Sequence, residues 1–246
     1  MFRKKTENRR FIDMHCHILP GIDDGSKDME ETMAMLRQAT DEGITEFIVT
    51  PHYKHGRRNA GPKTIHRLIE EVQEEAKRRA LPPIVLYPGQ EVFYFADLAE
   101  KLEEEDPNIL TMNDTECVLV EFMPGERYST IRNAIDDIRG SGYIPILAHA
   151  ERCECLVKDW KLIEDLKQLG CEIQINAPSI TGALGGTVKK FTHKLLSEQL
   201  VDYIGTDAHD AKRRTPSIQK CMDRLYKKYD REYVDAILYE NAKNLL

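Results

Sequence analysis

Cysteine is sparse in the sequence and occurs in no metal-binding pattern. The 246 residues include six cysteines and no Cys-x-x-Cys pair, which excludes a structural zinc site of the usual spacing. No apolar segment of a secretory signal follows the basic N-terminal residues, so a disulfide framework is not expected. No run of about 18 apolar residues is present either, which excludes a membrane-spanning helix. These absences predict a cytoplasmic protein with reduced thiols.

Several catalytic signatures are missing as well. None of the six cysteines has an arginine six positions later, so a Cys-x5-Arg thiol phosphatase is excluded. Gly-x-Ser-x-Gly, the P-loop pattern, Gly-x-Gly-x-x-Gly and His-Glu-x-x-His do not occur. The chain therefore needs a different source of reactivity if it is an enzyme.

Positive charge is in deficit except at the N-terminus. The net charge of -7 argues against nucleic acid as a partner of the whole chain. Residues 1–10 differ, because five basic residues stand there against one acidic residue, a net charge of +4. We predict a basic, flexible extension over 1–10, able to associate weakly with an anionic membrane surface, and a single domain over 11–246.

Apolar strand patterns alternate with helical patterns along the whole chain. The expected strands are 11–17, 44–50, 84–86, 117–122, 143–148, 171–176 and 201–206. The expected helices are 28–42, 62–79, 96–105, 127–139, 158–169 and 187–198, with a helical tail from 215. Such alternation is typical of an α/β fold with parallel strands joined by right-handed crossovers. A closed or nearly closed barrel of seven βα units is favoured, and an open doubly wound sheet is the competing arrangement.

The first expected strand carries a His-x-His pair. In regular alternation, Asp13, His15 and His17 point to one side of the strand. Ile12, Met14 and Cys16 then point to the other side. Alternate residues of a strand are about 6–7 Å apart, so both imidazoles could reach one metal ion.

Metal-ligating residue types recur where the other strands end. His17, His52, Glu91, Glu121, His149, Asp207 and His209 lie at or just beyond strand ends, His15 lies inside the first strand, and Asp24 lies in the first loop. This distribution favours the barrel, because barrel enzymes build their sites at the carboxyl ends of the strands. Several buried carboxylates need compensating cations, and only Arg152 and Arg214 are available nearby. The pattern therefore predicts two or three divalent metal ions.

These motifs resemble the polymerase-and-histidinol-phosphatase (PHP) superfamily. Within it, the chain is similar to the manganese-dependent protein-tyrosine phosphatases of bacterial capsule and exopolysaccharide loci. The resemblance rests on residues 13–25 (DMHCHILPGIDDG), 50–52 (TPH), 88–91 (PGQE), 113–115 (NDT) with 120–122 (VEF), 148–152 (AHAER), 179–182 (SITG) and 207–209 (DAH). One departure is Ala150, where the family usually has proline.

The resemblance implies a distorted seven-stranded TIM-like barrel with three metal ions at its mouth. One ion would be held by His15, His17, Glu91 and Asp207, a second by Glu91, Glu121 and His149, and the third by Asp24, His52 and His209. Manganese is the metal implied, with iron or zinc as alternatives, because the mixed ligands suit all three.

The implied activity is hydrolysis of phosphotyrosine on a protein, such as a bacterial tyrosine kinase that controls capsule synthesis. Arg152 and Arg214 would be the catalytic arginines that grip the phosphate. The basic run at 54–58 could attract acidic peptides. Two alternatives remain open: a phosphoesterase of the same superfamily acting on histidinol phosphate or another small metabolite, and a metal-binding protein without activity.

Overall fold

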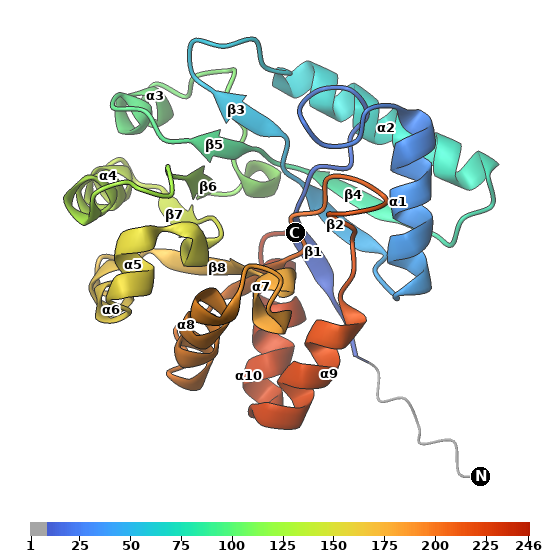
Figure 1. Cartoon of the computed structure of the whole chain (residues 1–246). Coiled ribbons are helices and arrows are strands. Elements are labelled where there is room, and N and C mark those ends of the chain that lie inside the picture. Colours follow the sequence, from blue (N-terminus) through green and yellow to red (C-terminus); the bar gives the residue numbers. More distant parts are fainter. Residues whose placement is uncertain (1–8) are drawn as a thin grey trace.

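Parallel strands form the centre of the molecule (Figure 1). The computed structural model describes residues 9–246. The strands are β1 Ile12–Cys16, β2 Glu46–Val49, β3 His52–Lys54, β4 Val85–Pro88, β5 Glu91–Phe93, β6 Cys117–Glu121, β7 Ile144–Leu147, β8 Glu172–Asn176 and β9 Tyr203–Gly205. One sheet has the order β1-β2-β4 and the other the order β3-β5-β6-β7-β8-β9.

The two sheets are parts of one closed ring. The second strand position of the barrel is formed by β2 and β3, and the third by β4 and β5. In both positions, two residues separate the two strands. Pro51 causes one interruption, since it has no N–H to donate to a neighbouring strand. The ring closes between β9 and β1, where Asp207 N donates to His15 O (2.8 Å) and His17 N donates to Ala208 O (2.8 Å). The predicted seven-stranded barrel is therefore confirmed and the open sheet is wrong.

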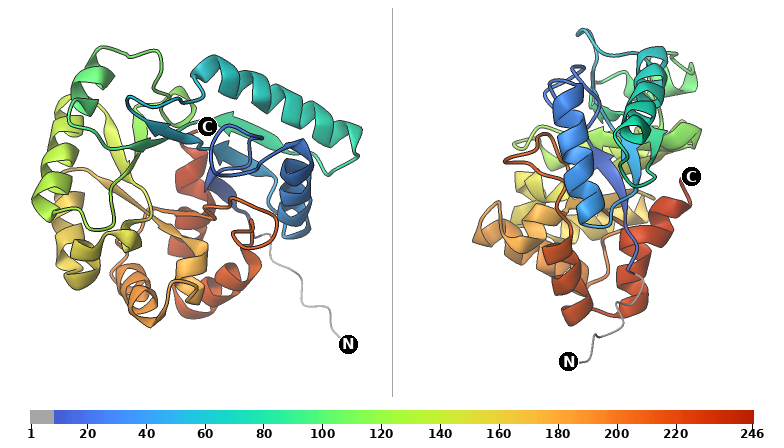
Figure 2. Two further views of the ribbon diagram at one scale, coloured as in Figure 1. Left: turned by 45° about the horizontal axis from the view of Figure 1, so that its top comes forward. Right: turned by 90° about the vertical axis from the view of Figure 1, so that its right-hand side faces the viewer.

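Helices surround the barrel on its outer side (Figures 1 and 2). They are α1 Met29–Asp41, α2 Pro62–Arg78, α3 Leu98–Glu103, α4 Tyr128–Gly140, α5 Glu154–Lys158, α6 Lys161–Gln168, α7 Ala177–Thr181, α8 Gly186–Ser197, α9 Gln219–Lys228, α10 Arg231–Asp235 and α11 Asn241–Lys243, with a π-helical segment at Ala236–Glu240. The Asp28 side chain caps α1 by accepting from Glu31 N (2.9 Å), as N-terminal aspartates commonly do.

Three predicted elements differ from the structure. The stretch 52–54 was expected as loop and forms β3, and β5 at 91–93 lengthens a strand position expected only at 84–86. The helix expected at 158–169 forms as α6, which begins at Lys161, and a short helix that was not expected, α5, precedes it at Glu154–Lys158. Asp159 separates the two helices, because its extended backbone (φ -138°, ψ 95°) cannot continue a helix.

Strand β1 does not keep the regular alternation that the sequence predicts. Its register against β2 shifts by one residue between Asp13 and Cys16, which is the signature of a β-bulge. Ile12 and Met14 pack inside the barrel, while Cys16 packs in the outer core. Asp13 bonds to Thr206 N (2.9 Å) on the neighbouring strand. The expected common side for Ile12, Met14 and Cys16 is therefore wrong, whereas His15 and His17 both face Glu91.

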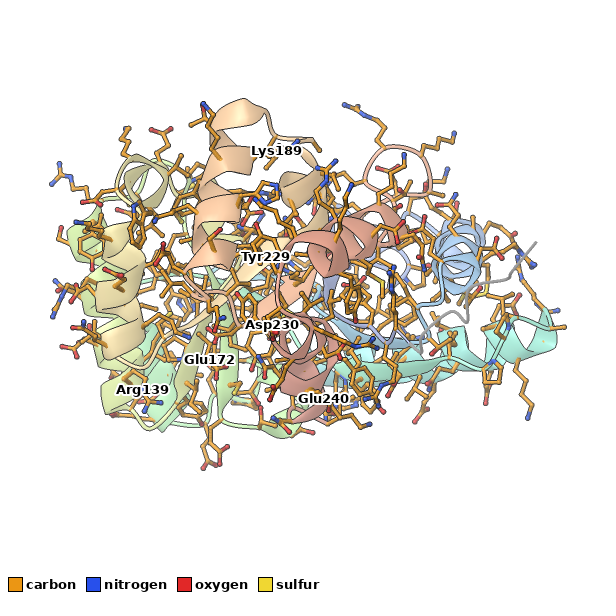
Figure 3. The ribbon with its side chains drawn as sticks, turned by 90° about the horizontal axis from the view of Figure 1, so that it is seen from below. Arg139, Glu172, Lys189, Tyr229, Asp230 and Glu240 are labelled. Carbon is orange, nitrogen blue, oxygen red and sulfur yellow. The ribbon has the colours of Figure 1, made fainter. Side chains whose placement is uncertain are left out.

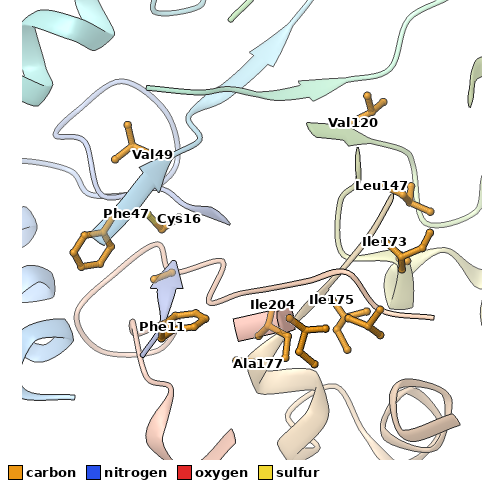
Figure 4. Packing of buried hydrophobic residues seen from close by; sticks show 14 of the residues in the cluster. Phe11, Cys16, Phe47, Val49, Val120, Leu147, Ile173, Ile175, Ala177 and Ile204 are labelled. Carbon is orange, nitrogen blue, oxygen red and sulfur yellow. The ribbon is translucent and has the colours of Figure 1, made fainter. Parts of the chain in front are cut away.

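The apolar core has two layers. The larger layer lies between the strands and the helices, and Figure 4 shows Phe47, Val49, Val120, Ile173 and Ile204 in it. The smaller layer fills the barrel interior. It contains Ile12, Met14, Ile48, Met112, Cys117, Leu119, Ile146, Ala148, Tyr203, Ala242 and Leu245. Because apolar side chains fill this part of the interior, the polar interior positions are concentrated at the other end of the barrel.

The C-terminal segment covers one side of the barrel, as the view from below shows around Tyr229, Asp230 and Glu240 (Figure 3). Asn113 Nδ2 donates to Leu245 O (3.0 Å), which fastens the last residues beside the barrel interior. Arg9 pairs with Asp223 (2.5 Å) and Arg10 with Glu240 (2.5 Å). The rest of the predicted extension, 1–8, lies outside the described residues. Within residues 9–246, no helix has the length and apolarity needed to cross a membrane.

Replacement of Gly205 by alanine tests how tightly the barrel closes. The added methyl would lie 2.6 Å from His15 Cβ and 3.1 Å from Gln174 Nε2. We expect the free energy of unfolding to fall by about 1–3 kcal/mol, as overpacking generally costs. Gly140→Ala is the control, since nothing lies within 4 Å of its added methyl. Urea unfolding of both variants measures the difference, and an unaltered midpoint for Gly205→Ala would contradict tight closure.

Candidate metal centre

All nine predicted metal ligands lie together at the mouth of the barrel. Their positions follow from the parallel strands, whose carboxyl ends meet at one face. Six of the nine are buried: His15, His17, Glu91, His149, Asp207 and His209. Asp24 lies on the loop after β1 with its side chain 68% exposed, so it forms the outer edge of the cluster.

Glu91 lies at the centre of the cluster. Its Oε1 is 2.7 Å from His149 Nε2 and 3.4 Å from His15 Nε2. Its Oε2 is 2.9 Å from His52 Nδ1 and 3.3 Å from His17 Nε2. One carboxylate thus faces four imidazoles, two on each oxygen, which is the arrangement a bridging ligand between metal ions needs.

The side chains around Glu91 form overlapping groups of possible ligands. Four groups have ligand atoms within 4.8 Å of one another: His17, Asp24, His52 and His209; His15, Glu91 and His149; His15, His17 and Asp207; and His52, Glu91 and Glu121. Asp24 Oδ1 lies 3.1 Å from His52 Nε2 and 3.6 Å from His209 Nε2. The three ligand sets implied by the family resemblance are geometrically possible, and their assignment to ions stays a prediction.

The electrostatics of the cluster call for bound cations. Burial and the charge of Glu91 raise the pKa of Glu121. Burial alone would lower the pKa of His17, but hydrogen bonds to Asp23 and Glu91 outweigh it and raise the pKa to about 10. His209 does not add a positive charge as His17 does, because burial and the charge of His17 lower the pKa of His209 to about 3. His52 Nδ1 is buried and makes no hydrogen bond of regular geometry, although Glu91 Oε2 lies 2.9 Å away. Carboxylate and imidazole ligands in these numbers fit divalent metals.

Two of the predicted ligands are held in an unusual backbone conformation. His149 has φ 31° and Asp207 has φ 53°, in the left-handed region that non-glycine residues rarely adopt. His149 N is fixed by Gln174 Oε1 at 2.6 Å, and Asp207 N by His15 O at 2.8 Å. Such backbone conformations are concentrated at functional sites, where surrounding contacts over-determine them.

Asp23 and Gln174 support the cluster and were not predicted as site residues. Asp23 Oδ2 lies 2.8 Å from His17 Nδ1, which sets the orientation of that ring. Gln174 Oε1 lies 3.2 Å from His15 Nδ1 as well as accepting from His149 N. A carboxylate or amide behind a ligating histidine fixes its tautomer. The adjacent Asp23–Asp24 pair was the available sequence signal, whereas nothing distinguished Gln174 from other strand residues.

Both predicted arginines contact the same ligand. Arg152 Nη2 lies 2.5 Å from Asp207 Oδ2, and Arg214 Nη2 lies 2.7 Å from Asp207 Oδ1. Their side chains are 30% and 39% exposed, so both guanidinium groups also face the solvent at the mouth. Ala150 begins the single helical turn Ala150–Arg152 that carries one of them. His55, in the basic run at 54–58, stacks its ring on Phe95, with 4.3 Å between the ring centroids.

Comparison with known proteins gives the chain's family. A family model described as "Capsular polysaccharide synthesis, CpsB/CapC" matches residues 11–246. The chain belongs to the CpsB/CapC family. Among its relatives, tyrosine-protein phosphatase YwqE of Bacillus subtilis is 32% identical over 235 residues, which are 96% of this chain and 91% of YwqE. Tyrosine-protein phosphatase CpsB of Streptococcus pneumoniae is 30% identical over 240 residues, 96% of this chain and 98% of CpsB.

Solved structures agree with this family. A crystal structure from work on YwqE and CpsB, described as unique metal-dependent tyrosine phosphatases, superposes with a TM-score of 0.87 at 31% identity, covering 96% of this chain and 94% of that one. Histidinol phosphate phosphatase of Lactococcus lactis superposes with a TM-score of 0.56 at 14% identity, covering 96% and 92%. That second likeness shows the shared fold alone. The predicted resemblance to this branch of the PHP superfamily is confirmed.

Asp23→Asn tests the support behind His17. The amide keeps the shape but removes the charge that holds the His17 ring, and changes of this kind typically cost 10–100-fold in metal affinity. We expect a loss in that range when the purified protein is titrated with Mn²⁺ in competition with a chelating dye. Asp41→Asn, on the exposed end of α1, is the control. Equal Mn²⁺ affinity in both variants would rule out the supporting role.

Proposed function

We propose that the nine clustered side chains hold metal ions for phosphotyrosine hydrolysis and that Arg152 and Arg214 bind the phosphate. The chain is a metal-dependent tyrosine-protein phosphatase of the CpsB/CapC family. One observation supports the residue assignment above all. The ligand groups centred on Glu91 lie directly beside an aspartate that contacts two arginines.

Different residues around the site would bind the metal ions, bind the phosphate and orient the arginines. Bound metal ions supply a nucleophile, by lowering the pKa of water toward neutrality, and stabilise charge on the phosphoryl oxygens. Arg152 and Arg214 each offer a planar fork of N–H donors that matches two phosphate oxygens. Asp207 holds both forks at the mouth before substrate arrives. The tyrosinate leaving group has a pKa of about 10, so a strong general acid is less necessary than for an alkyl phosphate.

The number and kind of metal ions are part of the proposal. Three ions would use His15, His17, Glu91 and Asp207; Glu91, Glu121 and His149; and Asp24, His52 and His209. Manganese is the metal proposed for the cell, with iron or zinc as alternatives, because affinity order alone does not select among mixed N/O ligands.

The substrate protein and the cellular location are proposed from the family resemblance. The substrate would be a bacterial tyrosine kinase that controls capsule or exopolysaccharide synthesis, in the cytoplasm. Residues 11–246 would form one catalytic domain. Residues 1–10 would add a basic extension with weak affinity for an anionic membrane surface, although Arg9 and Arg10 are already paired with carboxylates of the domain.

Substrate choice under defined metal content tests the activity. The protein loaded with Mn²⁺ should hydrolyse phosphotyrosine peptides much faster than phosphoserine peptides or histidinol phosphate, and exhaustive chelation should abolish turnover. Chelation should also lower the melting temperature, because buried carboxylates repel one another without cations. Faster turnover of histidinol phosphate would favour the small-metabolite alternative. Full activity in protein shown to be free of metal would defeat the metal mechanism.

Thiol modification should leave the activity intact. Burial raises the pKa of Cys117 to about 11 and those of Cys153 and Cys221 to about 12. Burial also raises the pKa of Cys16 well above its usual value. Thiolates are the reactive form, so none of these groups is a ready nucleophile. We expect iodoacetamide-treated, metal-loaded protein to keep its kcat, measured with p-nitrophenyl phosphate. Stoichiometric inactivation through one cysteine, with metals retained, would contradict this.

A further inference from the structure

A cavity of about 480 Å³ opens beside the metal centre. The predicted site residues Arg152, Asp207 and Arg214 line it. The other lining residues come from the end of β8, α7, the turn after it, the loop following β9 and the start of α9. These elements lie side by side in Figure 1. The volume is within the range of small-ligand pockets, and it exceeds what a phosphate group alone requires.

Two further basic side chains, Arg213 and Lys220, line this cavity. Both residues are exposed, and within residues 9–246 neither side chain is paired with a carboxylate. Asp207 is the single carboxylate among the lining residues, and Arg152 and Arg214 already contact it. Basic side chains therefore outnumber carboxylates among the lining residues, on a protein whose net charge is -7.

Part of the cavity wall is apolar. Pro178, Ala183 and Leu184 line it, and Leu184 is 48% exposed, one of few large hydrophobic side chains exposed in the described part of the chain. Apolar and basic side chains in one cavity with the two predicted catalytic arginines suit a tyrosine ring with an acidic side chain next to it in the peptide.

A second cavity of about 450 Å³ lies on the other side of the barrel mouth. It is lined by Lys54, His55, Arg57, Phe93, Tyr94, Phe95 and Met123. Apart from Met123, these residues lie on or just after β3 and β5, two strands that lie opposite α7 and α9 in Figure 1. None of the predicted metal ligands or catalytic arginines lines this second cavity, whereas three of them line the first. The first cavity is thus continuous with the phosphate position.

We propose that the first cavity binds the polypeptide next to the phosphotyrosine, and that Arg213 and Lys220 select acidic side chains there. This inference rests on the proposed phosphotyrosine activity and adds a specificity that the metal ligands do not provide. Each ion pair at an exposed site contributes little binding free energy by itself. Two contacts acting together give a preference of about five- to tenfold in KM, and the preference weakens as salt screens the charges.

The test compares two phosphotyrosine peptides on the metal-loaded enzyme, one with glutamates flanking the phosphotyrosine and one with glutamines. Wild type should have the lower KM for the acidic peptide, and 0.5 M NaCl should reduce the difference. The double variant Arg213→Ala/Lys220→Ala should raise the KM of the acidic peptide about five- to tenfold while kcat changes little. The charge-preserving variant Arg213→Lys/Lys220→Arg should restore most of the preference.

Two control variants separate this subsite from general charge effects. Lys212→Ala/Lys227→Ala removes two charges from the same loop and the same helix, at positions that do not line the cavity, and should keep the preference. Lys54→Ala/Arg57→Ala removes the charges of the second cavity. Loss of the preference in either control, or its persistence in Arg213→Ala/Lys220→Ala, overturns the inference. Equal KM values for both peptides on wild type also overturn it, whereas no turnover of any phosphotyrosine peptide would defeat the proposed function itself.

Discussion

The buried carboxylate of Glu91 is the feature on which the rest of the site depends. It is 1% exposed and faces four imidazoles. Burial alone would raise its pKa, but the charge of His15 and hydrogen bonds from His149, His15 and His17 hold it well below the usual range. A carboxylate kept ionised in a low-dielectric interior attracts cations strongly. The other predicted ligands surround this charge, as a cation site requires.

The barrel architecture makes this convergence possible. Residues from β1, the β3 and β5 strand halves, β6, β7 and β9 are far apart in sequence, yet parallel closure brings their carboxyl ends to one mouth. Closure itself occurs at the site, since the β9–β1 hydrogen bonds involve His15, His17 and Asp207. The backbone bonds that complete the ring therefore also position three ligands. This coupling explains why bulky additions near Gly205 would disturb both the ring and the site.

Much of the fold and the site could be predicted from the sequence, because period-2 and helical patterns alternate without interruption and ligand types recur at strand ends. Two kinds of detail could not. The β1 bulge depends on how strands pair, and no local pattern in 11–17 reveals the one-residue shift. Gln174 acts through contacts with His15 and His149, which are distant in sequence. Its role follows from tertiary placement, whereas propensity and spacing describe only neighbours along the chain.

The mouth of the barrel is chemically asymmetric. On one side, Arg152 and Arg214 line a cavity together with Arg213 and Lys220. On the other side, His55 stacks on Phe95 and Tyr94 on Phe122, which gives an aromatic rim. Under the proposed function, a phosphate held by Arg152 and Arg214 would lie beside the cavity that these arginines line, and away from the aromatic rim. The proposed metal ligands would then carry the reaction, and the side on which the arginines lie would decide which flanking residues the enzyme meets.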